Sequence, residues 1–384
     1  MPRNVPLIRP DLPTLEEIEA PLRSMLASGK LSNFGVHNQA LERGAEAYLG
    51  AQVATVSSGS QALLFALQAL GVGAPPGAPP PRVLIPSFTF MATAQAVVYA
   101  GAVPSYLEVG DDGNVDVEDL RAQLARLPDA AAVIGVHVYG LPCDVDGIEA
   151  VVADDAKRRG RRVKVLYDAA HAFGSALADG RRVGSLGDAE AFSLSVTKAL
   201  VCVEGGMVTS RDPALIERVR RMRNYGIQAA YDAAYPGVNG KMSELHALIG
   251  VANLARLDER LARRRELAAT LTARLHERTG FRTIPVPPGV THTFKDFVVR
   301  VPTRLASRRD AVCAALKERG IETRAYFFPP VHEQVRFKAF ADRPLPRTER
   351  FSREVITLPF FTTLQPEDMD AIVDGLAAAE RALA

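Results

Sequence analysis

Cysteine is scarce in this sequence, with Cys143, Cys202 and Cys313 as the three examples among 384 residues. The count is odd and no Cys-x-x-Cys pair occurs, so the chain carries no recognisable disulfide framework. Few cysteines are typical of proteins from a reducing compartment, and we therefore expect a cytoplasmic protein. No spacing of ligand residues points to a metal site, and we expect no bound metal.

Net charge and long apolar runs are also lacking. The formal net charge is +2, which is too small to indicate binding to nucleic acid. Residues 1–14 lack the apolar core of a signal peptide. Residues 83–107 carry no charge, but Pro86, Gly101 and Pro104 interrupt them, so we expect buried strands and a short helix there rather than a membrane span.

What the first part of the chain does contain is a regular alternation of helical and strand patterns. Apolar residues at spacings of three and four predict helices, and short apolar runs predict buried strands. The predicted helices span 60–70, 91–101, 115–127 and 148–160, and the strands 82–86, 103–109, 131–140 and 162–168. Such alternation predicts an α/β fold with a mostly parallel central sheet and helices on both faces.

The pattern changes after residue 241. Residues 242–280 read as long helices, followed by a strand at 293–302 and helices at 308–321 and 366–384. At 384 residues the chain is long enough for two domains. We expect a large α/β domain over 1–254, which includes the N-terminal segment, and a smaller α+β domain over 255–384.

A cluster of small residues opens the predicted helix that starts near residue 60. Ser58, Gly59 and Ser60 precede the apolar stretch "QALLFAL". Free backbone N–H groups and the helix dipole make such a terminus a site for phosphate or another anion. A simpler role for either serine is to cap the helix.

Two further polar side chains follow a predicted strand. Asp168 ends the strand at 162–168, and His171 comes three residues later. Ligands of such sheets bind at the carboxyl ends of strands, where an aspartate can hold the protonated ring nitrogen of a cofactor. Asp168 could equally cap the element that follows.

Lys198 lies in "FSLSVTKALVCVEGG", residues 192–206, after Ser193 and before two glycines. A lysine amine forms a Schiff base with a carbonyl compound when burial or a nearby cation lowers its pKa. An isolated lysine is usually a surface residue. A phosphate-binding helix start, a strand-end aspartate and a lysine, in this order, are nevertheless the three anchors that pyridoxal phosphate needs.

Six sequence blocks resemble the DegT/DnrJ-type sugar aminotransferases, which are fold-type I enzymes that use pyridoxal phosphate. The blocks read "SSGSQAL" (57–63), "PSFTFMAT" (86–93), "VHVYG" (136–140), "DAAHAFG" (168–174), residues 192–206, and "GVNGKMSE" (237–244). The resemblance covers nearly the whole chain, and six blocks in the family's order make it highly specific.

The resemblance implies a role for each matching residue. Lys198 corresponds to the Schiff-base lysine and catalytic base, and Asp168 to the partner of the pyridine nitrogen. The remaining cofactor-binding positions are Ser58, Gly59, Ser60, Phe90 (stacked on the ring), His171, Ser193 and Asn239. Asn239 corresponds to a residue that reaches the phosphate of the neighbouring subunit, which implies a homodimer with shared active sites. Without the resemblance, Phe90 reads as a core residue.

The resemblance also implies a substrate. Residues 324–334 are similar to a segment that lines a sugar-nucleotide pocket, which makes Arg324, Tyr326 and His332 candidate diphosphate or sugar contacts, and Lys241 a further one. The implied reaction moves an amino group from glutamate to a nucleotide-linked, dTDP-type 4-keto-6-deoxyhexose. Alternatives are a 3-keto sugar or keto-inositol aminotransferase, a dehydratase, and a non-enzymatic regulatory homologue. The dehydratase branch has histidine in place of the Schiff-base lysine, so the presence of Lys198 argues against a dehydratase.

This sequence departs from the family pattern in two places. The loop "GAPPGAPPPR", residues 73–82, replaces a Gly-Asp-Glu turn, and an asparagine that often follows the lysine block is missing from "ALVCVEGG". The first change affects a loop and not the site. The second bears on the identity of the sugar and not on the attachment of the cofactor to Lys198.

Overall fold

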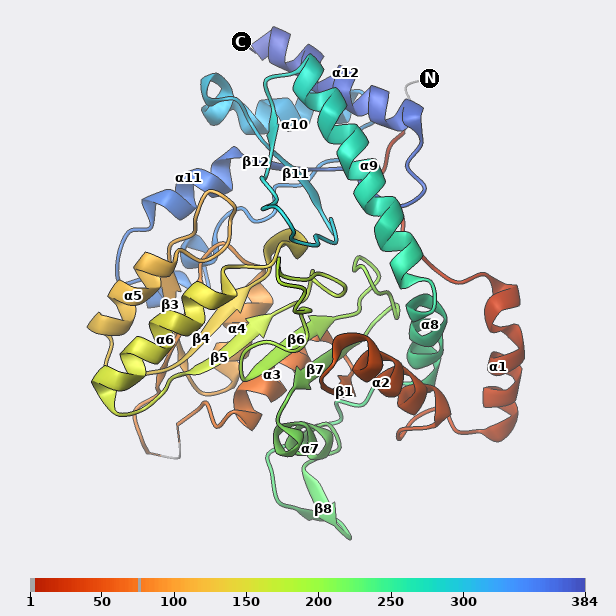
Figure 1. Cartoon of the computed structure of the whole chain (residues 1–384), viewed down its shortest axis with the longest axis vertical. Coiled ribbons are helices and arrows are strands. Elements are labelled where there is room, and N and C mark those ends of the chain that lie inside the picture. Colours follow the sequence, from red (N-terminus) through yellow and green to blue (C-terminus); the bar gives the residue numbers. More distant parts are fainter. Residues whose placement is uncertain (1–3, 75–76, 384) are drawn as a thin grey trace.

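The computed structural model describes residues 4–74 and 77–383. Its centre is a seven-stranded sheet in the order β1-β7-β6-β5-β4-β2-β3 (Figure 1). The strands are β1 (Gln52–Val56), β2 (Arg82–Pro86), β3 (Val103–Leu107), β4 (Ala130–Val136), β5 (Lys164–Asp168), β6 (Ala189–Ser193) and β7 (Gly206–Ser210). Only β7 runs against its neighbours, so the predicted mostly parallel α/β fold is confirmed.

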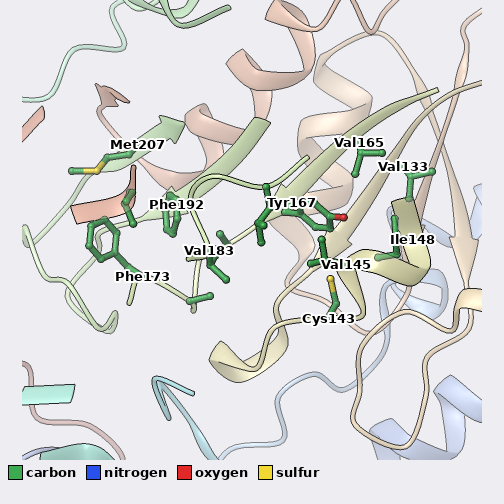
Figure 2. Packing of buried hydrophobic residues seen from close by; sticks show 14 of the residues in the cluster. Val133, Cys143, Val145, Ile148, Val165, Tyr167, Phe173, Val183, Phe192 and Met207 are labelled. Carbon is green, nitrogen blue, oxygen red and sulfur yellow. The ribbon is translucent and has the colours of Figure 1, made fainter. Parts of the chain in front are cut away.

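Helices cover both faces of this sheet because successive side chains of a strand point to opposite faces. In β5, Val165 and Tyr167 pack on one side and Leu166 on the other. The first face carries α2 (Val36–Leu49), α5 (Val117–Arg126), α6 (Val145–Arg159) and α8 (Glu244–Leu254), and the second carries α3 (Gly59–Ala69), α4 (Met91–Tyr99) and α7 (Pro213–Met222). Figure 2 shows the first core, in which Tyr167 and Phe192 lie among aliphatic side chains.

The C-terminal part builds a second layer with its own core. A three-stranded sheet of β10 (Arg282–Thr283), β11 (Phe297–Arg300) and β12 (Val355–Leu358) packs with α9 (Leu257–Arg278), α10 (Arg309–Glu318) and α12 (Pro366–Leu383). The N-terminal segment joins this core, since Val5 pairs with Ile321. We propose a division of the chain near residue 255, at the turn between α8 and α9.

The remaining elements lie at the edges. The N-terminal α1 (Leu15–Ser28) lies beside α8 (Figure 1). A small hairpin of β8 (Ile227–Ala229) and β9 (Asp232–Ala233) projects beyond α7, and α11 (Pro346–Glu354) precedes β12. Within the described residues, no helix is long and apolar enough to cross a membrane.

Two of the predicted strands end or begin several residues away from where their sequence patterns indicate. β4 ends at Val136, because the chain then forms a tight turn over Val138–Gly140 in which Tyr139 has a φ of 61°. β11 begins only at Phe297, and an irregular turn takes the place of the strand predicted from residue 293. Both departures occur where the chain approaches the cavity described below.

Truncation of a core side chain tests the packing of the first face. Ile148 of α6 is fully buried, so Ile148→Ala leaves a cavity and is expected to lower the free energy of unfolding by about 2–5 kcal/mol. Val335 is 86% exposed, and Val335→Ala is expected to change the free energy of unfolding by less than about 0.5 kcal/mol. Urea denaturation measures both, and equal losses would contradict the packing described.

Candidate active site

A cavity of about 350 Å³ lies at the carboxyl ends of the central strands. Its size is within the range of sites for small molecules. Nine of the side chains predicted for the site line this cavity together: Ser58, Gly59, Ser60, Phe90, Asp168, His171, Ser193, Lys198 and Tyr326. They come from segments up to 268 residues apart (326 − 58), so the fold itself assembles the site.

One wall of the cavity is the start of α3. Gly59 packs so closely against the end of β6 that a Cβ atom there would lie 2.6 Å from Cβ of Ser193. Glycine is therefore required for this contact, which puts the Ser193 hydroxyl next to the first turn of α3. The Ser58 hydroxyl accepts the Gln61 N–H at 3.2 Å and so caps the helix, as the simpler interpretation of this residue predicts. The first-turn N–H groups have no partner within a helix and favour an anion.

Asp168 lies at the last position of β5 and is 5% exposed. Its Oδ2 accepts the Thr93 hydroxyl at 2.7 Å, and its Oδ1 accepts the Ala170 N–H at 3.2 Å. Thr93 is itself 2.9 Å from the Thr89 hydroxyl. Burial raises the pKa of Asp168, and the Thr93 and Ala170 hydrogen bonds oppose this. A cation placed opposite the carboxylate would favour its ionised form.

His171 lies beside Asp168 with a defined tautomer. Its Nδ1 accepts the Tyr139 N–H at 3.1 Å, so in the neutral ring the proton is on Nε2. Burial, together with Lys198 and Lys295, lowers the pKa of His171 well below its usual value, which keeps the ring neutral. His171 can therefore donate one hydrogen bond from Nε2.

Lys198 lies in the segment that follows β6, and it lines the cavity. Burial lowers the pKa of its amine to about 7, and the nearby Lys295 acts in the same direction. Three carboxylates oppose this shift and raise the pKa of Lys198: Asp296, Asp168 and Glu204. A substantial fraction of this amine is consequently neutral near pH 7, the form that attacks a carbonyl carbon or accepts a proton.

Aromatic rings close the cavity on another side. Phe90 is 51% exposed, so it is not the core residue that its sequence pattern alone indicates. Its ring lies 6.3 Å from that of Phe327, which in turn stacks on His171 at 6.1 Å. Tyr326 lines the cavity, and its carbonyl accepts the Tyr139 hydroxyl.

Four predicted residues do not line the cavity. Asn239 is exposed, and the Lys241 amine lies 3.4 Å from Oδ1 of Asn224. Arg324 forms an ion pair with Glu322 near the surface. His332 is 6% exposed, and its Nδ1 is 2.7 Å from the Ser87 hydroxyl.

Several residues of the cavity were missed by the sequence analysis. The lining also includes Thr89, His137, Ser195, Thr197, Lys295 and Phe327, and Thr93 supports Asp168. Thr89 and Thr93 lie inside the block "PSFTFMAT", whose two threonines four residues apart were a usable signal. Lys295 and Asp296 were hidden by the strand predicted over 293–302, although adjacent charges in an apolar stretch mark it as unusual.

Comparison with known proteins gives a consistent result. Residues 14–377 match the model of the DegT/DnrJ/EryC1/StrS aminotransferase family. A UDP-N-acetyl-3-dehydro-alpha-D-glucosamine 3-aminotransferase of Acidithiobacillus ferrooxidans is 34% identical over 317 residues, 82% of this chain and 81% of the relative. A pleiotropic regulatory protein of Geobacillus stearothermophilus is 34% identical over 327 residues, 83% of this chain and 82% of the relative.

Among solved structures, DesI in the presence of its TDP-sugar product is similar throughout. The TM-score is 0.89 with 32% sequence identity, and the match covers 99% of this chain and 94% of DesI. The fold predicted from the resemblance is therefore that of known aminotransferase structures.

The lowered pKa of Lys198 predicts a specific pH dependence. In protein free of cofactor, acylation of the Lys198 amine is expected to rise as the pH increases through about 7 and to level off above it, because only the neutral amine reacts. In the denatured chain the same lysine is expected to titrate near about 10.4. Peptide mass spectrometry after pulse labelling measures both profiles. A folded-state midpoint near that of the denatured chain would contradict the electrostatics described here.

Proposed function

This chain belongs to the DegT/DnrJ/EryC1/StrS aminotransferase family, and we propose that it binds pyridoxal phosphate in the cavity and moves an amino group from glutamate to a nucleotide-linked keto sugar. The convergence of Lys198, Asp168 and the start of α3 on one cavity carries this proposal. Three chemically different anchors face the same space, and each matches one part of the cofactor.

The residues present fit the cofactor. The phosphate would bind at the N–H groups of Gly59 and Ser60 and at the Ser193 hydroxyl, where the missing Cβ of Gly59 leaves room for close approach. The protonated ring nitrogen would face Asp168, whose buried carboxylate lacks a cationic partner among the described residues. Phe90 would stack on the ring, and His171 would donate from Nε2 to its oxygen.

Pyridoxal phosphate, when bound, supplies the electron sink that makes a proton on the adjacent carbon labile. Lys198 would hold the cofactor covalently and, once released, move that proton with its neutral amine. Asp168 would keep the ring nitrogen protonated, fixed in place by Thr93 and Ala170. Phe90, Tyr326 and Phe327 would limit the access of water from the open side.

For the acceptor we propose a dTDP-linked 4-keto-6-deoxyhexose, which would give a 4-amino-4,6-dideoxy sugar nucleotide. DesI, the structural relative, was solved with a TDP-sugar product, which supports the nucleotide. The Acidithiobacillus relative acts at C3 of a UDP sugar and makes amination at C3 the leading alternative. Tyr326 is the proposed sugar contact that lies in the cavity of the same chain.

A product assay tests the function. The protein is mixed with pyridoxal phosphate, glutamate and dTDP-4-keto-6-deoxyglucose, and the amino sugar nucleotide is sought by mass spectrometry. Lys198→Ala is expected to fold normally and to lose turnover by at least about a thousandfold, because it removes both the covalent anchor and the base.

The alternatives give different outcomes in the same assay. Product from a 3-keto sugar nucleotide or a keto-inositol, without product from the 4-keto sugar, would correct the acceptor and leave the reaction class intact. Bound cofactor without transfer to any keto compound would favour a regulatory homologue. Steady-state turnover by Lys198→Ala would refute the role of this lysine.

We further propose a homodimer in which Asn239 reaches the active site of the partner subunit. Asn239 is exposed and lies outside the cavity of its own chain, next to the β8–β9 hairpin that projects from the body of the fold (Figure 1). An exposed polar residue beside such an extension is available for contact with a second subunit.

Complementation between two variants tests the shared site. Asn239→Ala is expected to weaken binding of pyridoxal phosphate, and Lys198→Ala to be inactive. After subunit exchange at equal concentrations, half of the dimers are mixed and carry one intact site of two, so about a quarter of the wild-type activity is expected. Asn239→Ala with unchanged cofactor affinity, or a mixture without recovery, would count against contact across the dimer.

A further inference from the structure

Lys295 is a buried lysine that faces the cavity and has no part in the function proposed above. It is 7% exposed and lines the cavity together with Lys198. Among the described lining residues, these two are the only Lys or Arg side chains. Asp296 lies behind it: the Lys295 amine is 2.8 and 3.0 Å from the two Asp296 oxygens, but Asp296 does not line the cavity.

The turn that carries Lys295 is held in place by hydrogen bonds to two other parts of the chain. Buried Arg264 of α9 donates to the carbonyls of Phe294, at 2.6 Å, and Lys295, at 3.1 Å. The Thr293 hydroxyl donates to the carbonyl of His171 at 2.8 Å, which ties the turn to the cavity wall. Phe294 has a φ of 48°, a strained conformation for a bulky residue that persists only where the surroundings enforce it. Such strain is common at ligand sites, and here it occurs at the residue before Lys295, which lines the cavity.

The proposed reaction brings a negative charge into this space. Glutamate carries an α-carboxylate on the same carbon as the amino group that it gives up. A carboxylate buried without a partner is strongly unfavourable, so a cation must lie within reach. Lys198 is unavailable, since its amine bonds to the cofactor or moves the proton.

We propose that Lys295 binds the α-carboxylate of the amino donor, an assignment that rests on the proposed aminotransferase function. Its ammonium group has three donors, and Asp296 faces it from behind, so one hydrogen bond remains for a ligand in the cavity.

The depth of Lys295 favours the donor carboxylate over the sugar diphosphate. The α-carboxylate is one bond from the reacting carbon and must lie near Lys198, as Lys295 does. In a keto sugar nucleotide, part of the sugar ring separates the diphosphate from the carbon that is aminated. A cation for the diphosphate is therefore expected nearer the mouth of the cavity.

Separate measurement of the two half-reactions tests the assignment. The variants are Lys295→Met, Lys295→Arg and, as a control at an exposed position of α10, Lys317→Met. For Lys295→Met we expect the glutamate concentration for half-maximal rate to rise about 10- to 150-fold, through loss of one charge-assisted hydrogen bond. The keto-sugar half-reaction, started from enzyme loaded with pyridoxamine phosphate, is compared at the pH optimum of each protein, so that the altered pKa of Lys198 does not enter the comparison. It is expected to change by less than about threefold. Lys295→Arg is expected to recover part of the glutamate effect, and Lys317→Met to match the wild type.

Three outcomes would overturn the assignment: equal losses in both half-reactions, a loss confined to the keto sugar, or no effect on glutamate. If Lys295→Met fails to fold because it leaves Asp296 unpaired, the double variant Lys295→Met/Asp296→Asn removes the pair as a unit. The same selective loss for glutamate is then expected. A wild-type protein that reacts with neither substrate would refute the proposed function itself, whereas a wild-type glutamate reaction unaffected by Lys295→Met refutes only this inference.

Discussion

Charge balance inside the cavity is the constraint on which the rest of the site depends. Two lysines, Lys198 and Lys295, and two aspartates, Asp168 and Asp296, are gathered where burial disfavours every charged form. The pairing is unequal. Lys295 already forms an ion pair with Asp296, whereas the Asp168 carboxylate accepts hydrogen bonds from neutral donors and the Lys198 amine makes none among the hydrogen bonds of the described residues. Asp168 and Lys198 are thus the two groups prepared for new partners.

The fold satisfies this constraint by placing the charges on segments that adjoin strands of its two sheets. Asp168 ends β5 and Ser193 ends β6, two adjacent parallel strands of the central sheet. The start of α3 can approach them because Gly59 has no side chain to collide with Ser193. Lys295 comes from the other side, on a turn held by Arg264 of α9. The cavity is therefore built between the central sheet and the C-terminal part, and neither part supplies it alone.

The sequence predicts the cofactor-binding residues on the central sheet well, and it predicts the turn that carries Lys295 poorly. Both outcomes have physical reasons. Asp168 and the start of α3 lie at junctions of strands and helices whose periodicity is strong, so their locations could be predicted. Lys198 lies in an irregular segment after β6 and was identified from its sequence block and the resemblance that this block carries. Lys295 lies in a turn created by tertiary hydrogen bonds from Arg264 and Thr293, which leave no local pattern. The alternation over 293–302 therefore predicted a strand, and the charged pair within it had no interpretation. His332 differs from Tyr326 of the same segment: Tyr326 lines the cavity, whereas the His332 ring is held by Ser87 and does not.

The two lysines also connect the steps of the proposed reaction. Lys295 is one of the groups that lower the pKa of Lys198, so anything that neutralises Lys295 makes Lys198 a stronger base. If the donor carboxylate binds Lys295, the negative charge of the carboxylate raises the pKa of Lys198 for as long as the donor occupies the cavity. Lys198 must take up a proton at that stage, when its higher basicity favours the transfer. Departure of the keto acid product would remove this charge and return Lys198 to its lower pKa, so that its neutral amine is available for the proton transfer of the second half-reaction.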